Sequence, residues 1–170
     1  MINKKKVLGI ITARAGSKGV KNKNLIKVNK RPLIYWPIKA LKKSKYVDRF
    51  ILSSDSKKIT KLANYYGCET PFLRPKSLAR DSSLSIDVIL HSLNFFKKRN
   101  FFFDYVVLLE PTSPLTTHKD VDNALKYLHN NKDLGDSIVG VSENIKLHPD
   151  FNFKIKKNKL INSKKKFYSK

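Results

Sequence analysis

Apolar runs alternate with amphipathic patterns along most of this chain. Short apolar segments of the length typical of buried strands occur at residues 7–12, 49–53, 104–109 and 137–141. Between them, apolar positions recur every three or four residues, as amphipathic helices require, at residues 32–44, 56–66, 84–98 and 120–130. Strands that alternate with helices and short loops predict an α/β fold with a doubly wound, mostly parallel sheet.

The pattern changes near residue 150. Two short apolar segments, 151–155 and 160–161, flank a lysine-rich stretch and predict a β-hairpin. Residues 162–170 are polar and basic and show no packing pattern. We therefore predict a nucleotide-binding α/β domain over residues 1–150, and an incomplete C-terminal hairpin with a basic tail over residues 151–170.

Polar loops follow three of the predicted strands, at residues 13–24, 53–56 and 110–117. In a parallel sheet these loops share one edge, and ligands bind there. The first loop combines small residues, cations and amides, which suits a polyanion because backbone N–H groups and Arg or Lys side chains bind phosphate oxygens. Its spacing matches neither the Walker A nor the dinucleotide-binding glycine pattern.

The formal net charge of the chain is +23, and most of its 36 cationic residues are lysines spread along the sequence. This spread favours a solvated basic surface without a specific partner. Two alternatives are an electrostatic field that attracts small anionic substrates and a polyanion partner. Zinc-binding and RNA-binding signatures are absent, so we expect no nucleic-acid partner. No apolar run reaches the roughly 18 residues of a membrane span, and the single Cys68 fits a reducing compartment, so we expect a cytoplasmic protein.

Several segments resemble, in order, the signatures of the acylneuraminate cytidylyltransferase family, whose members activate acidic nine-carbon sugars. The matching segments are A-R-A-G-S-K-G-V-K-N-K-N-L at 13–25, R-P-L at 31–33, S-S-D at 53–55, P-F-L-R-P at 71–75, L-L-E-P-T-S-P-L at 108–115 and H-P at 148–149. The resemblance implies a Rossmann-like nucleotidyltransferase fold. It also implies transfer of CMP from CTP to the anomeric hydroxyl of a sialic-type (nonulosonic) acid, with release of pyrophosphate.

The same resemblance assigns roles to individual residues. It implies that Arg14 and Lys23 are catalytic and that both bind the triphosphate. The expected nucleotide-binding set is Arg14, Ser17, Lys23, Asn24, Arg74 and Ser85, and the expected sugar-binding set is Glu110, Thr112 and Ser113. It further implies Mg²⁺ as cofactor, CTP and a nine-carbon acidic sugar as substrates, and a homodimer for a full-length form.

Departures from the family pattern leave alternatives open. The family usually has Gln at the place of Glu110 and Arg at the place of Thr116, so another sugar, such as Kdo, is a second hypothesis. The family's metal-binding aspartate pair has no counterpart here, so we expect a C-terminally truncated member with unknown metal ligands, and a non-catalytic nucleotide- or polyanion-binding remnant is a third hypothesis. Asp55 could replace a metal ligand or cap the helix at 56–66. Arg74 could instead form a surface ion pair, Ser85 could begin a helix, and Glu110 could pair with a lysine.

Overall fold

A computed structural model describes residues 1–16, 19–141, 153–157 and 159–162. The chain divides into two units, Met1–Tyr127 and Leu128–Lys170. Because residue 150 lies outside the described residues, the predicted domain boundary stays a prediction.

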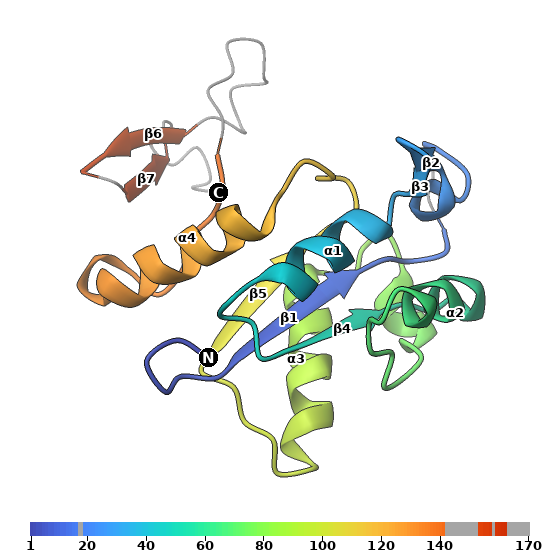
Figure 1. Ribbon diagram of the computed structural model, residues 1–170, viewed down its shortest axis with the longest axis horizontal. Coiled ribbons are helices and arrows are strands. Elements are labelled where there is room, and N and C mark those ends of the chain that lie inside the picture. The colour runs from blue at the N-terminus through green and yellow to red at the C-terminus, as the bar shows by residue number, and fades with distance from the viewer. Residues whose placement is uncertain (17–18, 142–152, 158, 163–170) are drawn as a thin grey trace, which may run out of the picture. The chain divides into compact units, whose positions relative to one another are not determined.

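A three-stranded parallel sheet forms the centre of the first unit (Figure 1). Its middle strand, β1 (Val7–Thr12), lies between β4 (Arg49–Ser53) and β5 (Tyr105–Leu109). Ile10 of β1 aligns with Ile51 of β4 and Leu108 of β5. The predicted parallel sheet is confirmed, and all three strands end at the same edge.

Alternation along β1 gives the sheet two apolar faces. Val7 and Ile11 belong to a core that α1, α2 and α4 cover, whereas Leu8 and Ile10 pack with Phe96 of α3 on the other face. Figure 1 shows α1 and α3 on opposite sides of β1. Burial of a Leu, Ile or Phe side chain contributes roughly 1.5–3 kcal/mol, so these two cores fix the strands and their carboxyl ends. The helices are α1 (Tyr35–Lys43), α2 (Lys57–Tyr65), α3 (Ser85–Lys97) and α4 (His118–Asn130).

Short elements complete the described structure. A two-stranded ribbon forms where Asn29 and Lys30 both adopt positive φ, 50° and 63°, the conformation of a type I′ turn. The predicted C-terminal hairpin is confirmed, and its strands pair Ile155 with Leu160. The elements are η1 (Lys23–Leu25), β2 (Lys27–Val28), β3 (Arg31–Pro32), η2 (Lys76–Ala79), η3 (Lys132–Leu134), β6 (Phe153–Lys156) and β7 (Lys159–Asn162).

Two local predictions are wrong. Residues 137–141 form no strand, and Val139 and Val141 are 61% and 54% exposed. A strand needs a neighbour that accepts and donates backbone hydrogen bonds, and no described strand pairs with this run. Asp55 does not cap α2, because the Ser56 side chain accepts the N–H of Ile59 instead. Gly67, which follows the end of α2, adopts the left-handed conformation with φ of 84°, as is common after a helix.

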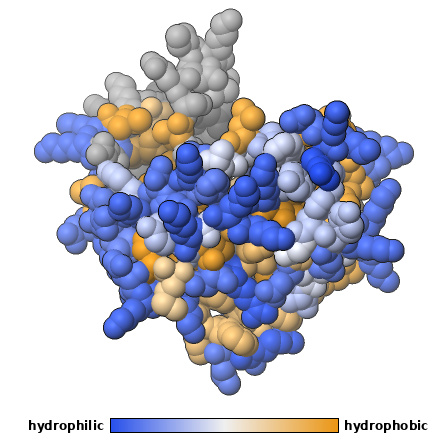
Figure 2. All heavy atoms as spheres, in the orientation of Figure 1, coloured by the Kyte–Doolittle hydropathy of each residue, from blue (hydrophilic) through white to orange (hydrophobic). Residues whose placement is uncertain are grey.

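Most side chains on the face of the molecule in Figure 2 are hydrophilic, as expected when lysines are spread along the chain. Within the described residues, no helix is both long enough and apolar enough to span a bilayer.

Candidate functional site

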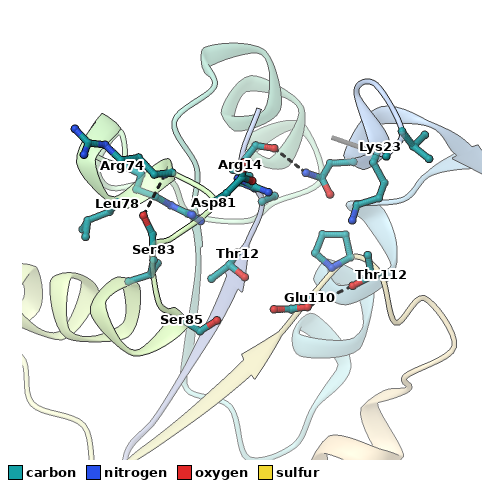
Figure 3. Close-up of a pocket in the computed structure, with 17 residues that line it drawn as sticks. Thr12, Arg14, Lys23, Arg74, Leu78, Asp81, Ser83, Ser85, Glu110 and Thr112 are labelled. Carbon is teal, nitrogen blue, oxygen red and sulfur yellow. Dashed lines mark hydrogen bonds and ion pairs between the residues drawn. The ribbon is translucent and has the colours of Figure 1, made fainter. Parts of the chain in front are cut away.

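A cleft of about 500 Å³ lies in the first unit, where β1 and β5 end (Figure 3). The loop after β1, the segment before α3 and the loop after β5 line it, as expected for a ligand site at the carboxyl edge of a parallel sheet. Most of the predicted site residues line this cleft: Arg14, Lys23, Asn24, Arg74, Ser85, Glu110 and Thr112. Ser17 lies outside the described residues. Ser113 is not among the lining residues, and its N–H donates to the carbonyl of Glu110 at 3.1 Å.

The loop after β1 is held in place by hydrogen bonds to its backbone. Asn24 is 5% exposed, and its Nδ2 donates to the carbonyl of Arg14 at 3.0 Å. One residue further along, the N–H of Ala15 donates to Asp55 Oδ1 at 2.8 Å. Asn24 was predicted to bind ribose or phosphate, and the structure gives its amide a supporting contact within the loop. Lys23 begins the η1 turn, and in Figure 3 its side chain extends toward the side of the cleft that Thr112 forms.

Arg14 forms an ion pair with Asp81 within the cleft. The side chains are 34% and 43% exposed, so water screens the pair, and such pairs contribute roughly 0.2–1 kcal/mol. A phosphate group with two charges attracts a guanidinium more strongly than one carboxylate does. Arg14 is therefore placed to exchange Asp81 for an anionic ligand at small cost.

Arg74 is buried rather than part of a surface ion pair. It is 6% exposed, its Nε donates to Ser53 Oγ at 3.1 Å, and its Nη2 donates to the Ser53 carbonyl. Burial lowers the pKa of Arg74 and the charge of Arg14 lowers it further, whereas the carboxylate of Asp55 opposes that shift. A buried cation held by neutral groups at the lining of a cleft is typical of an anion- or base-binding site.

The loop after β5 supplies an exposed carboxylate to the cleft. Thr112 Oγ1 lies 3.4 Å from Glu110 Oε2 and donates to it, and Pro111 is buried beside them. No lysine is paired with Glu110 among the ion pairs of the described residues. Ser85 is exposed at the first position of α3, where Leu84 is the N-cap residue and gives no side-chain cap.

Comparison with known proteins identifies the family. A sequence profile described as Cytidylyltransferase matches residues 8–167. This chain belongs to the cytidylyltransferase family.

Named relatives of this chain include synthases and cytidylyltransferases of acidic sugars. The chain is 38% identical over 146 residues to the CMP-N,N'-diacetyllegionaminic acid synthase of Legionella pneumophila, a match that covers 86% of this chain and 61% of that protein. It is 37% identical over 116 residues to the pseudaminic acid cytidylyltransferase of Campylobacter jejuni, covering 68% of this chain and 50% of that protein. The chain thus spans about half to two thirds of the length of these relatives.

A solved structure confirms the fold. The structure of CMP:2-keto-3-deoxy-manno-octonic acid synthetase complexed with CTP matches with a TM-score of 0.62 at 17% identity, over 75% of this chain and 48% of that one. The predicted nucleotidyltransferase fold is therefore confirmed.

The Mg²⁺ ligands that the resemblance implies are not identified among the described residues. They contain no group of three or more His, Cys, Asp or Glu side chains that could hold a cation. The cleft has two lining carboxylates, Asp81 and Glu110, and Asp81 already pairs with Arg14. Cys68 is 2% exposed, and burial raises the pKa of its thiol to about 12, so the thiol stays protonated near neutral pH.

Sequence reasoning missed part of the cleft of this cytidylyltransferase. Leu78 lies on η2, and Val88 lies one turn into α3, and both contribute apolar surface to the lining. Arg80 and Thr12 line the cleft as well. The residue types of Leu78 and Val88 do not indicate a binding site, since a leucine or valine in an amphipathic pattern is more often a core residue.

Proposed function

We propose that this chain forms the CTP-binding part of an enzyme that transfers CMP to the anomeric hydroxyl of a nonulosonic acid. The observation that supports the proposal is the convergence of Arg14, Lys23 and Arg74 on one cleft beyond the sheet edge. With Arg80, four cationic side chains line about 500 Å³ of space, which suits a nucleoside triphosphate in charge and in size. The family and the relatives named for CMP-sugar synthesis support cytosine as the base.

In the proposed reaction, the anomeric oxygen attacks the α-phosphorus of CTP, and the bond from that phosphorus to the bridging oxygen of pyrophosphate breaks. The proton of the sugar hydroxyl passes to solvent water, and the leaving pyrophosphate takes the electron pair of the broken bond. Arg14 and Lys23 neutralise the negative charge that builds on the α-phosphate and on pyrophosphate. Arg74 and Ser85 hold the cytidine half, so that attack occurs in line.

The loop after β5 is proposed to face the sugar. The Glu110 carboxylate repels an acidic sugar but accepts hydrogen bonds from sugar hydroxyls, and Thr112 offers a further hydroxyl. The names of the relatives support legionaminic, pseudaminic or a related nine-carbon acid as substrate. Kdo is the second candidate, and Glu110 favours it because the family pattern for sialic acid has Gln there.

Mg²⁺ remains a proposed cofactor that would enter with the phosphates of CTP, because a triphosphate supplies most of the oxygens that this cation needs. The roles given to Arg14, Lys23 and Arg74 do not depend on it. A homodimer remains a proposal for a full-length form, and sedimentation velocity tests it.

Release of pyrophosphate tests the proposal. CTP and Mg²⁺ are supplied with legionaminic, pseudaminic or sialic acid in turn, with Kdo as the fourth arm. We expect release with one of the three nine-carbon acids and its loss in the Lys23→Ala variant. Lys27→Ala is the matched control, because Lys27 is exposed on β2 and does not line the cleft. Release with none of these sugars overturns the enzyme assignment, and release with Kdo alone overturns the sugar class.

A further inference from the structure

The turn at the end of β4 contacts the side chain of Arg74 and the backbone beside Arg14, two of the three arginines that line the cleft, without lining the cleft itself. This segment, Ser53-Ser54-Asp55, begins at the last residue of β4 and is called the β4 turn. Asp55 Oδ1 accepts the N–H of Ala15 at 2.8 Å, directly after Arg14. Ser53 accepts the guanidinium of Arg74 through both its hydroxyl and its carbonyl.

Backbone contacts reinforce this arrangement. The N–H of Arg74 donates to the carbonyl of Ser54 at 2.8 Å, and the N–H of Ala13 donates to the carbonyl of Ser53 at 3.1 Å. Ser53 and Ser54 are both fully buried. Since a buried turn with several hydrogen bonds has little freedom to move, it holds the two segments that carry Arg14 and Arg74 at a fixed separation.

We propose that the β4 turn is the positioning element of the nucleotide site, in which Asp55 orients the phosphate-binding loop and Ser53 orients Arg74. Neither residue is assigned contact with substrate. Arg14 is set for the triphosphate through Ala15, and Arg74 is set for the cytidine half through Ser53.

The charges around the turn agree with this assignment. Arg14 lies close enough for its charge to lower the pKa of Arg74, and the carboxylate of Asp55 opposes this shift. Asp55 therefore does two things: it accepts a backbone N–H of the loop, and it offsets the repulsion between the two cations. An Asn at this position keeps the acceptor oxygen and loses the charge.

The inference rests on the proposed function. The roles of Asp55 and Ser53 are tested separately with CTP, which carries the triphosphate, and with cytidine, which lacks it. In NMR titrations, Asp55→Ala is expected to weaken CTP binding about tenfold and to leave cytidine binding within about twofold, because a hydrogen bond of a charged group is worth about one decade. Ser53→Ala is expected to weaken CTP and cytidine alike, because it removes one of the two hydrogen bonds that orient the guanidinium of Arg74. Asp55→Asn is expected to restore part of the CTP affinity.

Asp48 provides the matched control. Its Oδ2 accepts the N–H of Val7 at 2.8 Å, the same kind of bond at the same distance, but at the other end of β4 and away from the cleft. Asp48→Ala therefore removes an equivalent backbone contact, together with the ion pair between Asp48 and the N-terminal ammonium group at 2.7 Å. We expect it to leave the ratio of CTP to cytidine affinity at the wild-type value.

The outcomes distinguish this inference from the proposed function. If the wild-type chain binds CTP and Asp55→Ala keeps the CTP-to-cytidine ratio of Asp48→Ala, the positioning role is overturned while the proposed function stands. If the wild type does not bind CTP, the proposed function fails. Amide hydrogen exchange then still tests the loop contact: faster exchange at Ala15 in Asp55→Ala, with Asp48→Ala unchanged there, supports it, and unchanged exchange overturns it.

Discussion

The substitution Arg74→Met measures two effects of the buried charge separately: its effect on the free energy of unfolding and its contribution to CTP binding. The side chain is 6% exposed, and its guanidinium bonds only to the hydroxyl and carbonyl of Ser53 among the described hydrogen bonds. Two hydrogen bonds from a charged donor contribute about 1.5–3 kcal/mol each. Burial of the cation costs several kcal/mol, and the lowered pKa of Arg74 reflects that cost.

The two terms are of similar size, so Arg74→Met is expected to change the free energy of unfolding by no more than about 1 kcal/mol. CTP affinity is expected to fall about 10- to 100-fold, because a charge-assisted hydrogen bond to the ligand is lost. Urea denaturation and isothermal titration with CTP measure the two effects.

Arg49→Met is the control for this experiment. Arg49 pairs with Glu69 at 2.6 Å and lies over the ring of Phe96, away from the cleft. Its replacement is expected to cost about 1 kcal/mol of stability and to leave CTP binding unchanged. The reasoning is refuted if Arg74→Met loses more than about 3 kcal/mol of stability and still binds CTP within twofold of the wild type.

Three further predictions concern the pair at the cleft, the centre of the sheet and the buried thiol. Asp81→Asn frees Arg14 and is expected to raise CTP affinity about two- to fivefold in a titration, and weaker binding would contradict a competing role for Asp81. Gly9→Ala places a Cβ 2.8 Å from Leu41 Cδ1, so thermal denaturation should show a loss of about 1–3 kcal/mol, and an unchanged Tm would argue against close packing there. Because the pKa of Cys68 is raised to about 12, a thiol reagent at pH 8 should label the protein only after urea is added, and rapid labelling of the native protein would refute this.

Much of the fold was predictable because it depends on local apolar patterns. The strands at Val7–Thr12 and Arg49–Ser53 match their predicted bounds, since each is an apolar run buried on both faces of the sheet. The helices agree to within a few residues because their apolar faces repeat every three or four positions. The run at 137–141 is apolar as well, but it does not form a strand. Strand formation depends on pairing with a neighbouring strand, which the local composition does not reveal.

The candidate site also has features that the sequence predicts and features that depend on the fold. Arg14 and Lys23 could be expected at the cleft from the sequence, because the loop that carries them resembles the family signature. The ion pair between Arg14 and Asp81, and the bond from Ala15 to Asp55, join segments far apart in the chain, and no local pattern encodes them. The burial of Arg74 also depends on the fold, since a lone arginine in a loop is more often exposed.

The central claim is that the cleft beyond β1 and β5 binds CTP. Competition among CTP, UTP, GTP and ATP for this chain, measured at equilibrium with Mg²⁺ present, tests it most directly. The account predicts that CTP binds at least about tenfold more tightly than the other three nucleotides, a difference of about 1.4 kcal/mol. Equal affinity for all four nucleotides, or no binding of CTP, would contradict it.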